Sequence, residues 1–73
     1  MPPRFGARLV VAIAPADVGK RVTVRRSTAE GFRDTVGELV SWCDGVLTVR
    51  RRNGELVEIA EETLAAAKVV PPL

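Results

Sequence analysis

Arginine is the residue type best suited to do chemistry in this chain of 73 residues. Nine of the eleven basic residues are arginine, and a guanidinium group suits bidentate contacts with phosphate or carboxylate better than a lysine ammonium group does. The formal net charge of +2 is small, so it permits an acidic partner without demanding one. The candidate contacts to a phosphate or an acidic partner come from two arginine clusters and are Arg25, Arg26, Arg50 and Arg52.

Strand alternation divides the second arginine cluster between two faces. Successive side chains of a strand point to opposite faces, so Arg50 and Arg51 do not form one patch. We expect Arg50 on the outer face, joined by Arg52 at a turn, and Arg51 in an ion pair with Glu38 or Glu55. Solvated, partly paired strand charges are therefore the main interpretation, and phosphate contact in a nucleic-acid-binding barrel is the alternative.

The other reactive groups predict no catalytic or metal site. The chain has no histidine, and its single cysteine, Cys43, therefore has neither an activating partner nor a second thiol for a disulfide. Strand alternation separates Glu55 from Glu58, and Glu61 and Glu62 have the position of solvated acids in a first helical turn. We expect no catalytic residue, no metal ligand and no cofactor, and a reducing, cytoplasmic setting.

Two dipeptides predict how the strands are arranged. Asp44-Gly45 and Asn53-Gly54 lie between alternating apolar residues, which is the strongest short-range signal for a hairpin. They predict a three-stranded meander. A turn at Pro15–Gly19, with Gly19 at positive φ, precedes it. The full prediction is strands over 20–26, 34–42, 46–51 and 55–60, a polar loop over 27–33, and one helical or 3₁₀ turn from 61 before a short last strand at 68–70.

Burial selects the register of the Asn53-Gly54 hairpin. A three-residue loop, with Gly54 in the left-handed region, pairs Val49 with Val57 and Leu47 with Ile59 on one face. A two-residue loop would mix polar with apolar residues on every rung. The bulged three-residue loop is therefore expected.

The Asp44-Gly45 turn decides the place of the single tryptophan. A two-residue turn pairs Trp42 with Leu47, Val40 with Val49, and Glu38 with Arg51, whereas a three-residue turn aligns Leu39 with Val49 and turns Trp42 outward. We expect the first, because Asp-Gly fits a type I′ turn and the tryptophan is then buried. In the alternative, Trp42 is a contact aromatic on the surface.

These elements predict an all-β fold, a small SH3-like barrel of about five strands with one short helical or 3₁₀ turn before the last strand. We expect an N-terminal arm or extra edge strand over 1–14, the barrel over 15–70 and a Pro-rich tail over 71–73. The apolar run from Leu9 to Ala14 is six residues, below the roughly 7–15 of a signal peptide and the ~20 of a membrane span. We therefore expect no membrane association, and the residues from Leu9 to Ile13 are a candidate for self-association by strand addition.

The sequence also resembles a known family. The segments APADVGKRVTVRR and DTVGELVSWCDGVLTVRRRNGELVEIAEETLAAAKVVPP, within residues 14–72, are similar to the N-terminal SH3-like domain of actinobacterial GNAT-type acetyltransferases. The resemblance implies an acetyltransferase domain, histone acetyltransferase-like, downstream of the final prolines or as a separate partner. No catalytic residue is carried over, because the chain to Leu73 contains none of that domain. The implied function is a non-catalytic accessory domain.

Overall fold

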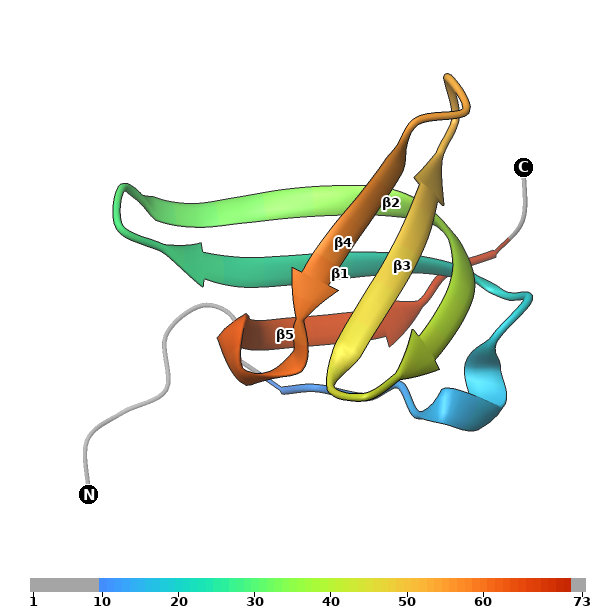
Figure 1. Cartoon of the computed structure of the whole chain (residues 1–73), viewed down its shortest axis with the longest axis horizontal. Coiled ribbons are helices and arrows are strands. Elements are labelled where there is room, and N and C mark those ends of the chain that lie inside the picture. The colour runs from blue at the N-terminus through green and yellow to red at the C-terminus, as the bar shows by residue number, and fades with distance from the viewer. Residues whose placement is uncertain (1–9, 72–73) are drawn as a thin grey trace.

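Five antiparallel strands form a single bent sheet in the computed structural model, which describes residues 10–71. The sheet order is β4-β3-β2-β1-β5. β3 and β4 cross over the layer formed by β1, the first half of β2, and β5 (Figure 1). The elements are η1 (Pro15–Asp17), β1 (Arg21–Thr28), β2 (Gly31–Cys43), β3 (Val46–Arg51), β4 (Leu56–Ala60), η2 (Glu61–Thr63) and β5 (Leu64–Val69), where η marks a 3₁₀ turn. The predicted all-β fold, with a 3₁₀ turn before the last strand, is confirmed.

The core lies between the two layers of the bent sheet. Alternate residues of each strand point inward, as the period of two requires. The expected inward residues Leu47, Val49 and Ile59 are all buried, and Val57 is partly buried against them. Within residues 10–71, the buried apolar residues are Ile13, Val22, Val24, Leu39, Leu47, Val49, Ile59 and Ala67.

The β3–β4 hairpin has the predicted register. Val49 pairs with Val57 and Leu47 with Ile59, and Gly54 has a φ of 90° in the turn. The backbone N–H of Arg51 donates to the carbonyl of Glu55 at 2.7 Å and closes the three-residue loop.

The β2–β3 hairpin has the predicted two-residue turn, but two of the predicted residue pairs further along its strands are wrong. Asp44 and Gly45 both have positive φ, and Trp42 pairs with Leu47 across a two-residue turn. The predicted pairs of Val40 with Val49 and of Glu38 with Arg51 are wrong. A bulge lies between Leu39 and Ser41, so Leu39 pairs with Val49 and Glu38 with Arg50. A bulge adds one residue to a strand and bends it, which a strongly curved sheet requires.

The predicted polar loop over 27–33 is wrong. β1 and β2 continue through it to a tight turn at Ala29 and Glu30 (Figure 1). Gly31 takes a φ of 113°, and the Thr28 hydroxyl donates to the Gly31 carbonyl and accepts from the Glu30 N–H. Most side chains here are polar, with Phe32 as the large apolar exception, because this end of the hairpin extends beyond the core.

The last strand of the chain, β5, pairs with the first, β1. β5 begins at Leu64, four residues earlier than predicted, because Ala67 is buried where it pairs with Val24 of β1. Among residues 10–14, the arm before η1 forms an isolated parallel bridge between Val11 and Ala67, and Ile13 is buried in the core. Leu9 lies outside the described residues.

Candidate interaction surfaces

Arg25 lies on the outer face of β1 and forms an ion pair with a carboxylate of β2. Its Nε donates to Asp34 Oδ1 at 2.8 Å and its Nη2 to Asp34 Oδ2 at 3.1 Å, across the β1–β2 ladder. The guanidinium also lies 5.6 Å from the centroid of the Phe32 ring. Arg25 is therefore held by its neighbours, which lowers its capacity to bind a phosphate.

This ion pair predicts a loss of stability in acid. The hydrogen bonds and charge of Arg25 hold the pKa of the Asp34 carboxyl below its ordinary value of 3.8. A lowered pKa contributes stability that is complete above 3.8 and is lost as the pH falls through the folded-state value. In urea unfolding as a function of pH, Asp34→Asn should lower the midpoint most above pH 3.8 and progressively less below it. A difference that stays constant down to the lowest pH would contradict this.

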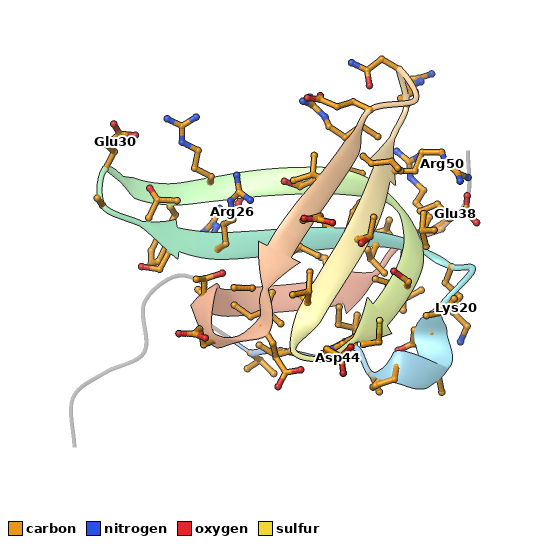
Figure 2. The ribbon with its side chains drawn as sticks, viewed as in Figure 1. Lys20, Arg26, Glu30, Glu38, Asp44 and Arg50 are labelled. Carbon is orange, nitrogen blue, oxygen red and sulfur yellow. The ribbon has the colours of Figure 1, made fainter. Side chains whose placement is uncertain are left out.

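Arg26 occupies the opposite face of the same strand. It stands across from Arg33 on β2 and Leu64 on β5, at the end of the core. Figure 2 shows its side chain on the face of β1 and β2 that β4 crosses. Its Nε is buried and has no hydrogen-bond partner among the described residues. Arg25 and Arg26 therefore do not share a surface.

The other two candidate arginines lie on the β3–β4 hairpin. Arg50 is on the outer face as predicted, and its Nη1 donates to Glu38 Oε1 at 3.0 Å (Figure 2). Arg51 pairs with Glu55 at 3.1 Å, one of its two expected partners. Arg52 is exposed at the turn. The four predicted contact residues thus lie on two hairpins and point in different directions.

Trp42 is half-buried and packs against the core. Its Nε1 donates to Glu61 Oε1 at 2.6 Å, which ties β2 to η2. Glu61 was expected as a free solvated acid and instead binds Trp42, because the N–H of Glu61 is held on the Gly45 carbonyl at 2.8 Å beside the β2–β3 turn. Only the three-dimensional structure brings these residues together.

Removing the hydrogen bond between Trp42 and Glu61 should lower the stability of the domain by a measurable amount. Glu61→Ala is expected to destabilise the domain by about 1 kcal/mol, because the indole N–H loses a charged acceptor at a partly solvated site. Glu62→Ala is the matched control and should change stability by less than about 0.5 kcal/mol. Urea unfolding followed by the fluorescence of the single tryptophan measures both. Equal effects of the two substitutions would contradict the structural role of Glu61.

A shallow hollow lies on the outer face where the arm, β5, β1 and β2 meet. It has a volume of about 390 Å³ and carries the Arg25–Asp34 pair together with Lys68. Asp34 and Lys68 were not predicted as site residues, because the sequence alone does not show that they lie beside Arg25. The lining residues are Val10, Ala12, Thr23, Arg25, Asp34, Ala66, Ala67 and Lys68.

Cys43 is an exposed free thiol. Within residues 10–71 no group of three or more acidic, cysteine or histidine side chains is placed to hold a metal ion. None of the helical segments in that part of the chain is long and apolar enough to cross a membrane.

A five-stranded antiparallel sheet, bent over one small core and carrying dispersed ion pairs, defines a small β domain. The chain belongs to the family of the Rv0428c N-terminal Sm-like domain, whose model matches residues 16–68. Comparisons with curated proteins and with solved structures gave no match.

Proposed function

We propose that this chain is a non-catalytic accessory domain that packs on, or recruits substrate to, an acetyltransferase domain of the GNAT type. The family membership carries the proposal, because the description of the family places the domain at the N-terminus of Rv0428c. The resemblance of residues 14–72 supplies the acetyltransferase link. The matched region ends at residue 68, just before the prolines where the resemblance places the junction with a catalytic domain.

The end of β5 indicates which surface such a domain would meet. The chain leaves the sheet after Val69, with the N–H of Val70 donating to the carbonyl of Arg21 at 2.9 Å. It leaves on the side of the β3–β4 hairpin (Figure 1). Cross-strand register aligns Arg21 with Glu38, Glu38 with Arg50, and Arg50 with Leu56 on the outer face of the sheet there.

This surface has the mixed character of an interface between domains. Leu56 is 56% exposed, and Glu38 lies between two arginines of neighbouring strands. Interfaces between domains of one chain are moderately polar and combine apolar contacts with charged pairs. A domain packed here would cover Leu56 and the Arg50–Glu38 pair and would itself supply the catalytic residues.

Two measurements test the proposal. Reading the encoding DNA past codon 73 should show an acetyltransferase domain, and a frame that closes without one would overturn the intramolecular form. Amide hydrogen exchange should then be slower at Leu56 and Arg50 in the whole protein than in this chain alone. The β1–β2 turn at Ala29 is the internal control and should exchange equally fast in both. Equal exchange at Leu56 would exclude docking on this surface.

The nucleic-acid alternative has less support from the geometry. Arg25 and Arg50 each form an ion pair with a carboxylate, and the four arginines do not line one groove. We expect no measurable binding of single-stranded RNA or duplex DNA at about 50 mM salt, where phosphate contacts are strong. Binding that weakens steeply with salt in a titration would favour the alternative instead.

A further inference from the structure

The first half of β2 is a strand with one free edge. Residues 31–36 pair with β1 on one side, and pairing with β3 starts only at Gly37. No strand in the described part of the chain pairs with the other side of this segment. Figure 1 shows it as the upper edge of the long hairpin that projects beyond the barrel. Unpaired strand edges present backbone donors and acceptors to any extended segment that approaches them.

The register identifies the backbone groups on this edge. Leu39 donates its N–H to the Lys20 carbonyl, and its own carbonyl accepts from the Gly19 N–H, so its backbone faces β1. Backbone direction alternates along an antiparallel strand, and the bulge of β2 lies beyond Leu39. Phe32, Asp34 and Val36 therefore direct their N–H and C=O groups to the free edge.

The outer face beside this edge carries two apolar side chains, Phe32 and Val36, and Asp34 lies between them in its ion pair with Arg25. Phe32 and Val36 are 54% and 40% exposed, although both are large apolar side chains. The Arg25 guanidinium lies over the Phe32 ring, and a cation at a ring face holds the aromatic side chain in place. A strand added here would cover both residues on its outer side.

The inner face beside the same edge is basic. Arg26 and Arg33 are directly opposed on β1 and β2, and like charges at opposed positions destabilise a sheet. Arg33 has an acidic partner in Glu30 at 3.1 Å, but both side chains are more than half exposed, so this ion pair is weak. Arg26 has no ion pair with any described residue, and its buried Nε lacks a hydrogen-bond acceptor there. Carboxylates at this position would relieve the repulsion.

We infer that residues 31–36 of β2 dock an extended acidic segment of a partner protein as an added strand. The free backbone groups supply the hydrogen bonds, and side-chain alternation supplies the selectivity. Glutamate or aspartate of the partner lies on the inner face beside Arg33 and Arg26. Its alternate apolar residues lie on the outer face beside Phe32 and Val36.

The positive charge beside this edge favours an acidic segment of another protein over a strand from a second copy of this chain. β4 is an edge strand of the sheet, and its inward residues are Val57 and Ile59, which would bring no carboxylate to Arg26 and Arg33. The interaction goes beyond the proposed function, because it requires no acetyltransferase domain. It also uses a different hairpin from the surface beside Val69.

A designed peptide tests the inference on the full chain. The probe is a capped peptide in which valine alternates with glutamate, titrated into ¹⁵N-labelled protein. We expect shifts and slowed exchange at the amides of Phe32, Asp34 and Val36. A peptide with lysine in place of glutamate, and one with N-methylated backbone amides along its docking edge, should not bind. Equal binding of either control, or shifts confined to other strands, would overturn the inference.

Protein variants separate charge recognition from loss of folding. Arg33→Gln should weaken binding by roughly threefold and Arg26→Gln by a similar factor, as expected for single ion pairs at a partly solvated site. Arg52→Gln removes the same charge from the other hairpin and should leave binding unchanged. The amide spectrum of each variant establishes that it is folded. Wild-type affinity in a folded Arg33→Gln variant, or competition by single-stranded RNA for the same amides, would contradict an acidic peptide ligand.

Discussion

Gly37→Ala is expected to destabilise the domain by about 3 kcal/mol or more, which is a large part of the stability of a domain this small. Gly37 is a buried residue of β2 that pairs with Val22 on one side and Arg51 on the other. A Cβ atom there would collide with the carbonyl oxygen of Arg50 and lie 2.8 Å from its carbonyl carbon. Backbone on a neighbouring strand cannot move aside without breaking the ladder, so the cost is high.

A second glycine provides the matched comparison. Gly31→Ala adds the same methyl group where nothing lies within 4 Å, but at a φ of 113°. It should cost about 1–2 kcal/mol from backbone strain alone. Urea unfolding followed by tryptophan fluorescence and by far-ultraviolet circular dichroism measures both variants. If Gly37→Ala costs no more than Gly31→Ala, the close approach of β2 to β3 is wrong.

Leu39→Ala should cost about 2–5 kcal/mol, the range for truncating a fully buried leucine in a packed core. Leu39 has no exposed surface and packs in the cluster that contains Leu47 and Ile59. The large effect follows from the bulge, since an uninterrupted β2–β3 ladder would place Val40 in the core instead of Leu39. The substitution therefore tests the register of β2 as well as the packing.

Val40 and Val24 allow the same substitution, valine to alanine, to be compared at a partly buried and a fully buried position. Val24 is fully buried, whereas Val40 is only partly buried. Val24→Ala should cost about 2 kcal/mol or more, because it removes buried methyl groups and leaves a cavity, and Val40→Ala should cost about 1 kcal/mol or less. Urea midpoints measured under one set of conditions rank the three variants. A Val40→Ala variant as unstable as Val24→Ala would support the uninterrupted ladder.

Short-range sequence patterns were sufficient to predict the three-stranded meander and the register of one of its two hairpins, β3–β4. Asn53-Gly54 and Asp44-Gly45 are each local turns, and burial of Leu47 with Ile59 leaves only one register for the β3–β4 hairpin. The opposed faces of Arg50 and Arg51 follow from the same alternation. These features depend on residues close together in the chain, so they are readable from the sequence.

The far end of the β1–β2 hairpin, at residues 27–33, escaped prediction because the strands extend past the core there. Ser27, Thr28 and Arg33 do not alternate between apolar and polar residues, so the pattern indicated a loop. Pairing between two long strands maintains the β structure there even without an apolar face. The candidate docking edge of β2 was missed for the same reason.

The arginines show most clearly which features follow from the sequence and which depend on the tertiary structure. By itself the sequence determined an all-β meander, its two tight turns and an excess of arginine over lysine. Only the tertiary structure decided that Arg25 binds Asp34, that Arg50 binds Glu38, and that Arg26 faces Arg33. The physical reason for the Arg50–Glu38 pair is the bulge in β2, which changes the residue that faces Arg50. The other two pairs depend on the β1–β2 ladder, which continues through residues 27–33 without alternation of apolar and polar side chains. Neither the bulge nor this continuation is marked by a periodic pattern in the sequence.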